Sequence, residues 1–218
     1  MTQPAPPIFV TAIGTDSGKT VFSAILVEAL QADYWKPIQS GLPRDTETVA
    51  RLVSNPISQF HREAYLLSQP LSPHASAAID GITIDLNTIH LPVTHNRLVM
   101  EGAGGILVPL NQSNFVIELA DKFAAEVILV ANLYLGSINH TLLSVNELKR
   151  RAATGKMTIK GIVFNHSPVE SSEEIILHHT GLPCLLRINT HPSITKDIVK
   201  HYAAQLRQTL MQPTASVR

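Results

Sequence analysis

Apolar residues along the chain fall into short continuous runs, separated by longer stretches in which apolar positions recur at helical spacing. The short runs predict strands that are buried on both faces, and they cover residues 8–13, 34–38, 97–101, 126–132, 159–165 and 183–188. The longer stretches predict helices over residues 21–30, 46–53, 115–124, 138–151 and 171–179. This alternation favours a mainly parallel, doubly wound α/β sheet with helices on both faces, in a single domain over residues 1–218.

Charge and composition exclude several classes of function. Seventeen basic and seventeen acidic residues cancel, so we expect no nucleic-acid partner and no attraction to anionic lipid. The sequence lacks a run of roughly 18 apolar residues, which a membrane helix requires. Its single cysteine, Cys184, suits a reducing compartment. We therefore expect a soluble, cytoplasmic protein with no membrane partner, and disordered ends at residues 1–6 and 212–218.

The segment FVTAIGTDSGKT, residues 9–20, lies where a phosphate-binding loop must lie, between the first predicted strand and the first predicted helix. The usual loop has a glycine, four free residues and then Gly-Lys-Ser/Thr. That spacing would place the first glycine at Ile13, whereas this chain has Gly14. The segment therefore has the position of a phosphate loop and an irregular first half.

Two side chains at the end of this segment suit a nucleotide. Lys19 would bring a cation to the terminal phosphates, and the Thr20 hydroxyl would be a magnesium ligand. Backbone N–H groups at a helix start also attract phosphate oxygens. The alternative is an ordinary helix start, capped by Asp16 or Ser17, with Lys19 in solvent.

A magnesium ion needs acidic partners, and two carboxylates follow later strands. Glu101 ends the third predicted strand and runs into the glycine-rich segment GAGG, residues 102–105, which predicts a turn that lets backbone approach a ligand closely. Asp45 lies just before the second predicted helix. Each could bind the ion directly or through water. For Asp45 alone, solvation or helix capping is the simpler interpretation.

Lys36 stands in an apolar segment, YWKPIQSG, residues 34–41. Pro37 excludes a continuous helix there. The lysine must extend its charge to solvent or meet an anion. If it points into the same crevice as Lys19, the two cations would serve one phosphate-bearing intermediate.

Several segments together resemble the dethiobiotin synthetase family, enzymes with a P-loop NTPase type of fold. They occur in the family's order and run from residue 9 to about residue 190. These segments are FVTAIGTDSGKT (9–20), WKPIQSG (35–41), QPLSPHASA (69–77), VMEGAGGILVPL (99–110), LGSINHTLL (135–143) and GIVFNH (161–166).

The resemblance implies a reaction. The family carboxylates 7,8-diaminononanoate with CO2 to a carbamate, phosphorylates the carbamate with ATP, and lets the second amine displace phosphate to close a ureido ring. Magnesium is the implied cofactor and ATP the co-substrate. Two cations are needed because carbamate and γ-phosphate are both anions.

The resemblance also implies site residues. The implied catalytic residues are Lys36, Lys19 and Thr15. Those implied to bind nucleotide are Gly14, Thr15, Asp16, Ser17, Gly18, Lys19, Thr20 and, toward the adenine, Asn165, with the backbone near 185–189 framing the base. The implied magnesium ligands are Thr20, Asp45 and Glu101. The implied substrate contacts are Ser40 and the loop formed by Gly136, Ser137, Ile138 and Asn139.

In the family the LGSINH loop lies at a homodimer interface and holds the carboxylate of substrate bound to the other subunit. A helix N-terminus suits that anion, so we expect a symmetric dimer with two composite sites. We assign no proton-transfer role to His74 or His140.

Departures from the family pattern keep alternatives open. The loop has Ala12, Ile13 and Gly14 where a different spacing is usual, Gln39 replaces a smaller residue, and the segment 185–189 lacks an expected proline. One alternative is a nucleotide-switched ATPase of the partitioning or metal-delivery kind, which shares the loop and sheet and typically has a second lysine where this chain has Gly14. Others are a cobyrinate synthetase domain, which would need a glutaminase domain, and a catalytically inactive binding protein.

Overall fold

Seven parallel strands form the central sheet of the computed structural model, which describes residues 5–166 and 168–211. The described residues form nine strands in all, of which β3 and β5 lie outside the central sheet: β1 (Ile8–Ala12), β2 (Asp33–Trp35), β3 (Ile38–Ser40), β4 (Phe60–His61), β5 (Tyr65–Leu67), β6 (Leu98–Gly105), β7 (Glu126–Asn132), β8 (Thr158–Asn165) and β9 (Cys184–Ile188). The helices are α1 (Lys19–Leu30), α2 (Asp45–Leu52), α3 (Pro73–Ile79), α4 (Glu118–Lys122), α5 (Ser137–Ala152), α6 (Glu170–Thr180) and α7 (Lys196–Met211), with a 3-10 turn at Leu86–Thr88.

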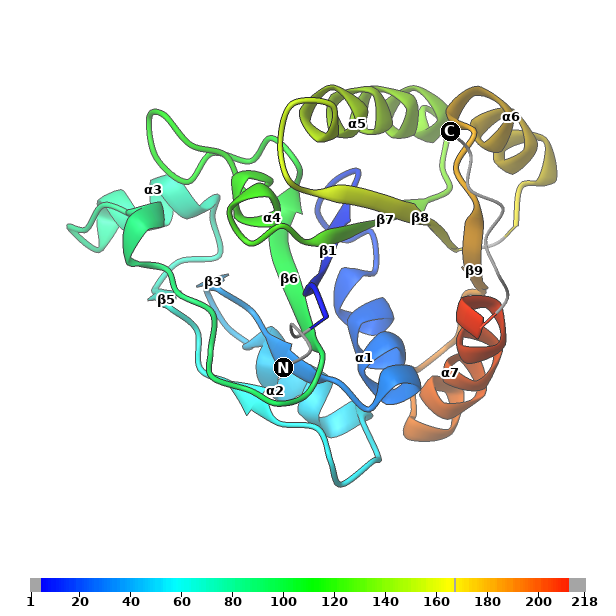
Figure 1. Cartoon of the computed structure of the whole chain (residues 1–218), viewed down its shortest axis with the longest axis horizontal. Coiled ribbons are helices and arrows are strands. Elements are labelled where there is room, and N and C mark those ends of the chain that lie inside the picture. Colours follow the sequence, from blue (N-terminus) through cyan, green and yellow to red (C-terminus); the bar gives the residue numbers. More distant parts are fainter. Residues whose placement is uncertain (1–4, 167, 212–218) are drawn as a thin grey trace.

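The strand order of the main sheet is β4-β2-β6-β1-β7-β8-β9, and β3 pairs with β5 in a second, two-stranded sheet. The chain starts in the middle at β1, builds one half of the sheet as far as β4, and then crosses to β7 and the other half (Figure 1). In such sheets ligands bind outside the carboxyl ends of the strands, where the order reverses. That point lies at the end of β1, between β6 and β7.

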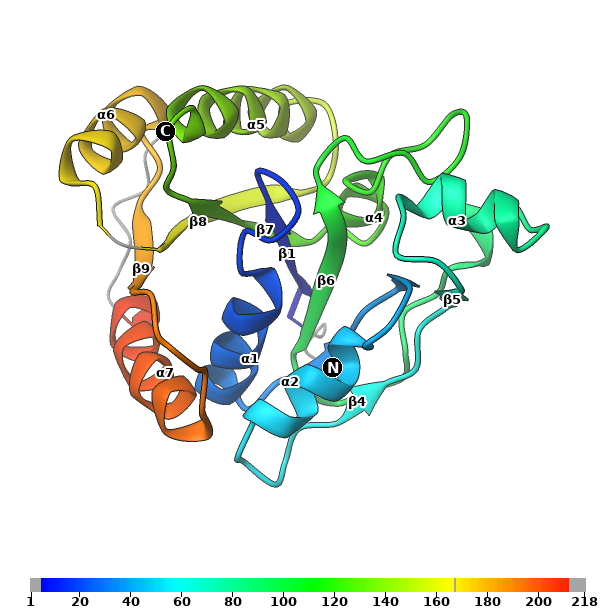
Figure 2. The same cartoon turned by 180° about the vertical axis from the view of Figure 1, so that it is seen from behind.

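Helices cover both faces of the sheet. Helices α1, α2 and α7 pack on one face, while α4, α5 and α6 pack on the other (Figure 1). The view from behind shows α3 and β5 on the side of the molecule away from α6 and β9 (Figure 2). Each face has its own hydrophobic core, so the central strands are buried on both sides, as a mainly parallel sheet requires.

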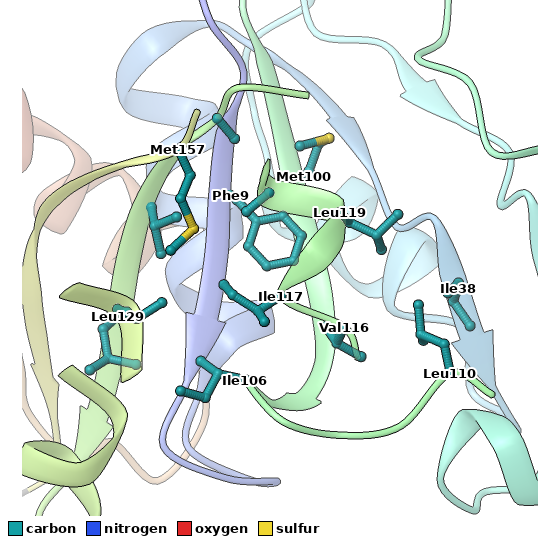
Figure 3. Packing of buried hydrophobic residues seen from close by; sticks show 14 of the residues in the cluster. Phe9, Ile38, Met100, Ile106, Leu110, Val116, Ile117, Leu119, Leu129 and Met157 are labelled. Atoms are coloured by element: carbon teal, nitrogen blue, oxygen red, sulfur yellow. The ribbon is translucent and has the colours of Figure 1, made fainter. Parts of the chain in front are cut away.

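Strand β1 shows how the sequence divides between the two cores. Ile8 and Val10 point toward α1, whereas Phe9 points to the opposite face, and all three are fully buried. Figure 3 shows the Phe9 ring among Met100, Ile117 and other apolar side chains. The alternation follows from the two-residue period of a strand.

The predicted fold class is confirmed, and the six apolar runs all form strands at nearly the predicted bounds. The run 34–38 differs because it divides into β2 and β3. Pro37 has no N–H to donate to a sheet, and its carbonyl accepts instead from Ala64 (2.9 Å) and Tyr65 (3.0 Å). The chain therefore leaves the main sheet after Trp35, and Lys36 and Pro37 connect β2 to β3.

The glycine-rich segment 102–105 is part of β6 and not the turn that its composition predicts. A Cβ on Gly102 would lie 3.0 Å from the Phe9 ring, so glycine lets that ring pack against the strand. Helix α4 is also shorter than the predicted span 115–124. The first residues of the predicted span bond instead to the segment after β6: the N–H of Val116 donates to the carbonyl of Val108 at 2.9 Å, and that of Ile117 to Ile106 at 3.2 Å.

Two other expectations concern the whole chain. Among residues 5–166 and 168–211, no helix combines the length and the apolar character needed to cross a membrane. Of the ends predicted to be disordered, residues 1–6 and 212–218, all but residues 5 and 6 lie outside the described residues.

Replacing Phe9 by alanine should lower the free energy of unfolding by about 3–5 kcal/mol, because the change removes a fully buried ring and leaves a cavity. Urea denaturation measures the change, and the dependence on urea concentration should stay constant. Val93→Ala is the control, since that side chain is 93% exposed and should shift stability by roughly 0.5 kcal/mol or less. Equal losses for the two variants would contradict this account of the core.

Candidate active site

A cavity of about 770 Å³ opens at the carboxyl ends of β1, β2 and β6. Its walls come from the loop before α1, the turn before α2, the segment before α3 and the glycine-rich end of β6. The lining residues are Thr15, Asp16, Gly18, Lys19, Thr20, Val21, Lys36, Gln39, Ser40, Asp45, Pro70, Leu71, Ser72, Pro73, Glu101, Ala103, Gly104 and Val108. The cavity therefore gathers most of the predicted site residues in one place.

The loop between β1 and α1 turns sharply at two residues with positive φ, Asp16 (57°) and Gly18 (90°). A Cβ on Gly18 would lie 2.2 Å from Asn165 Nδ2, so only glycine fits there. At Gly14, an added Cβ would meet no described atom within 4 Å, and φ is not positive. In the irregular first half of the loop there is thus room for a side chain at position 14. Position 18 is the one at which the loop requires glycine.

Lys19 begins α1 and folds back over the loop. Its Nζ donates to the carbonyl of Gly14 at 3.0 Å, and the Ser17 hydroxyl donates to the same carbonyl at 3.1 Å. Only 7% of Lys19 is exposed. The alternative of a helix start capped by Asp16 or Ser17, with Lys19 in solvent, is therefore wrong: Gly18 is the N-cap residue, and no described side chain caps it.

Burial lowers the pKa of Lys19 to about 8, because the ammonium loses water that its neighbours replace only in part. The Glu101 carboxylate favours the charged form, and the nearby Lys36 ammonium opposes it. An anion bound against Lys19 would supply the missing compensation. The loop is therefore arranged to gain from a phosphate group.

Glu101 is 1% exposed and accepts hydrogen bonds on both carboxylate oxygens. Its Oε1 accepts from Thr20 Oγ1 at 3.0 Å and from Lys36 Nζ at 3.1 Å. Its Oε2 accepts from the hydroxyl of Tyr34 at 2.9 Å. Burial, and next the charge of Glu101, raises the pKa of Tyr34 well above its ordinary value.

Lys36 lies between the two acids. Its Nζ is 2.6 Å from Asp45 Oδ2 and 3.1 Å from Glu101 Oε1, and it also donates to the carbonyl of Gly102 at 3.1 Å. Burial opposes the charge, but Glu101 and then Asp45 outweigh it, so the pKa of Lys36 is raised. The side chain does not extend to solvent, because only 4% of the residue is exposed.

Thr20, Asp45 and Glu101 fit a hard cation. They provide a hydroxyl and two carboxylates at one wall of the cavity, and both carboxylates contact the same ammonium. Among the described residues, no group of three or more His, Cys, Asp or Glu side chains could enclose a metal ion. Magnesium is compatible with such a set, since it usually takes one or two carboxylates and completes its shell with water and substrate phosphates.

Other predicted residues lie apart from this wall. Ser40 lines the cavity, and its buried hydroxyl has no hydrogen-bond partner among the described residues. Asn165 is outside the lining and donates its amide to the carbonyl of Ser17 at 3.0 Å. Residues 136–139, at the start of α5, do not line the cavity either. The adenine contact and the substrate contact at these two places stay predictions.

Comparisons with known proteins decide the family. A family model described as an AAA domain matches residues 7–197. The chain is 55% identical to the ATP-dependent dethiobiotin synthetase BioD of Cytophaga hutchinsonii over 91% of this chain and 95% of that protein. The chain belongs to the dethiobiotin synthetase family. The dethiobiotin synthetase of Christiangramia forsetii, at 45% identity, covers 94% of this chain, with 97% of its own length matched.

The resemblance predicted from the sequence segments is therefore confirmed, and with it an enzyme of biotin biosynthesis that has a nucleotide-binding P-loop. A solved ParA family ATPase from Chlorobium tepidum superposes with a TM-score of 0.55 over 95% of each chain. At 13% identity, this likeness shows a shared fold alone. It does not favour the partitioning ATPase, because family membership rests on the much closer dethiobiotin synthetases.

The sequence does not predict every group at this site. Tyr34, which bonds Glu101 behind the cavity wall, has no sequence signal, because an aromatic residue in an apolar strand predicts only core packing. Gln39 is unusual for the family, but its residue type predicts no role. The residue types of segment 70–73 do not indicate that it forms a wall of the cavity.

Affinity for ATP should fall as pH rises above about 8. Below that pH, Lys19 is charged and meets the phosphates directly, whereas above it the free protein must first take up a proton. The dissociation constant should then rise by up to about tenfold per pH unit. Titration calorimetry between pH 7.5 and 9.5, in two buffers with different ionisation enthalpies, measures the affinity and the proton uptake.

The matched control is Lys19→Arg, whose guanidinium stays charged over this range and should bind ATP with little pH dependence. A wild-type affinity that is constant up to pH 9.5, with no proton uptake, would contradict the role given to Lys19.

Proposed function

We propose that this chain, as a single domain, uses ATP, Mg²⁺ and CO2 to close the ureido ring of 7,8-diaminononanoate, giving dethiobiotin, ADP and phosphate. The observation that carries the proposal is one cavity that holds two buried lysines, Lys19 and Lys36, beside a hydroxyl and two carboxylates. Bringing a carbamate next to a triphosphate opposes two anions, and preorganised cations offset that repulsion.

The two lysines have different tasks in this proposal. Lys19 lies at the loop and neutralises the β- and γ-phosphates. Lys36, which is held by Asp45 and Glu101, stabilises the carbamate while a carbamate oxygen receives the phosphoryl group and ADP leaves. The second substrate amine then attacks the carbamate carbon and expels phosphate, so the chain needs no covalent nucleophile of its own.

Neighbouring groups complete this site. Thr20, Asp45 and Glu101 would hold the magnesium ion, which when bound spreads the charge of the transferring phosphoryl group. Thr15 and Asp16 line the cavity from the loop and would face the phosphates. The unpaired hydroxyl of Ser40 supports a role as donor to the carbamate or its amine.

For the adenine, we propose that the Asn165 amide reads the base beside the loop. Asn165 is the last residue of β8. Its side-chain amide donates to the carbonyl of Ser17, so it lies next to the phosphate-binding segment. The backbone near residues 185–189, in and directly after β9, would frame the same base.

We also propose a symmetric homodimer in which residues 136–139 hold the carboxylate of substrate bound to the other subunit. Ser137 Oγ is buried without a described hydrogen-bond partner, at the first turn of the 16-residue helix α5. Leu135, directly before this loop, is fully exposed. The Ser137 hydroxyl at a helix N-terminus supports the binding of an anion there. The exposed Leu135 side chain supports a surface that a second subunit covers.

The remaining expectations concern location and other partners. A balanced charge of 17 basic and 17 acidic residues supports neither a nucleic-acid nor a membrane partner. The single free thiol of Cys184 suits a cytoplasmic protein.

Lys36→Gln should abolish ring closure, with a loss of at least about a hundredfold in kcat, and leave ATP affinity within a few fold. The substitution removes the cation from the carbamate side and keeps the loop cation at Lys19. Rates come from mass-spectrometric detection of dethiobiotin, and affinity from calorimetry. Unchanged turnover would remove the proposed role of Lys36.

Phosphate release should require the diamine. Purified protein given ATP, Mg²⁺ and bicarbonate should release phosphate at a negligible rate until 7,8-diaminononanoate is added, because the carbamate is the phosphoryl acceptor. A coupled phosphate assay and mass spectrometry of the ureido product measure both sides of the reaction. Hydrolysis that is independent of the diamine, with no ureido product, would favour the nucleotide-switched ATPase.

A further inference from the structure

Each of the two acidic residues at the cavity wall has a buried polar neighbour to which the family resemblance gave no role: Tyr34 bonds the carboxylate of Glu101, and Gln39 bonds the backbone N–H of Asp45. We propose that Tyr34 and Gln39 are positioning residues that fix Glu101 and Asp45, respectively, in the orientation that a divalent cation requires. The inference deepens the proposed function, because it rests on the magnesium role given there to the two carboxylates.

Tyr34 determines which oxygen of Glu101 faces the cavity. Strands β2 and β6 pair so that Tyr34 lies beside Val99, two residues before Glu101. From there its hydroxyl donates to Glu101 Oε2 at 2.9 Å, in a place where Tyr34 is fully buried. With Oε2 held, Oε1 faces the Thr20 hydroxyl and the Lys36 ammonium, and it is the oxygen that we assign to the divalent cation.

Gln39 determines where Asp45 lies, because its side chain crosses the turn between β3 and α2. Its Oε1 accepts from the backbone N–H of Asp45 at 3.0 Å, and its Nε2 donates to the carbonyls of Gly41 (3.2 Å) and Ser40 (3.3 Å). Gln39 is only 6% exposed. One amide thus ties both ends of the turn together.

The helix itself needs this contact. Helix α2 begins at Asp45 after the N-cap residue Arg44, whose own side chain forms no capping hydrogen bond. An uncapped N–H at a helix start seeks an acceptor, and Gln39 provides one from outside the helix. The Asp45 carboxylate is then directed to the Lys36 ammonium, 2.6 Å away.

Groups that orient metal ligands commonly change metal affinity by roughly ten- to a hundredfold when they are removed. A residue that only fills space would instead change stability, and nucleotide affinity with it. The two roles can therefore be separated by measuring metal binding and metal-free nucleotide binding on the same variants.

The test measures Mn²⁺ binding to the full-length protein in the presence of a non-hydrolysable ATP analogue. Electron paramagnetic resonance detects the Mn²⁺ that remains free. The variants are Tyr34→Phe, which removes only the hydroxyl, and Gln39→Glu, which keeps the shape and the acceptor but sets a carboxylate against two carbonyls. Each should weaken Mn²⁺ binding by about tenfold. Analogue affinity in EDTA should stay within twofold of the wild type, and excess Mg²⁺ should restore turnover.

Matched controls remove similar groups elsewhere. Tyr65→Phe deletes a hydroxyl that bonds Thr88, and Gln205→Glu changes an amide that bonds His201 on α7. Neither side chain touches the two carboxylates, so Mn²⁺ affinity should stay at the wild-type value.

Three results would overturn the inference. Wild-type Mn²⁺ affinity in both Tyr34→Phe and Gln39→Glu would show that neither residue positions a ligand. An equal loss of metal-free analogue affinity would show a general structural role. Retained Mn²⁺ affinity in Asp45→Asn and Glu101→Gln would show that the proposed magnesium role itself is wrong, and this result is distinguishable because it does not involve the positioning variants.

Discussion

The site depends on one constraint, which is that a buried ammonium must be paired. Lys36 can be buried only because Asp45 and Glu101 both reach it, and losing one partner of such a pair typically costs about 3–5 kcal/mol. The three residues come from the end of β2, the start of α2 and the middle of β6. Their meeting requires β2 to lie beside β6 in the observed register, so the charges assemble only when the sheet is complete.

The same surroundings give the two lysines opposite properties. Burial dominates at Lys19 and lowers its pKa to about 8, whereas the two carboxylates raise the pKa of Lys36. Lys36 is therefore a permanent cation, already compensated before any ligand arrives. Lys19 is undercompensated and gains most from an incoming phosphate. The incompletely compensated charge of Lys19 makes the loop side of the cavity the part that attracts an anion most strongly. This agrees with a site that binds the nucleotide phosphates there.

Much of this could be predicted from the sequence, because buried parallel strands leave continuous apolar runs and chemistry collects at their carboxyl ends. Helix α7 could also have been found, since Val199, Tyr202, Ala203 and Leu206 are buried at helical spacing. Only Pro37 indicates that the apolar run 34–38 divides into the two strands β2 and β3. The contacts of Tyr34 and Gln39 had no sequence signal, because they depend on strand register and on the path of a turn, which residue types alone do not determine.

The close approach of Gly18 to Asn165 joins two strand ends that lie on opposite sides of β7. The Asn165 amide is hydrogen-bonded to the carbonyl of Ser17, and a Cβ added at Gly18 would lie 2.2 Å from the amide nitrogen. A side chain at position 18 would therefore displace the end of β8 as well as distort the loop before α1, so one substitution would disturb two places, at Ser17 and Asn165, that are 148 residues apart in the sequence.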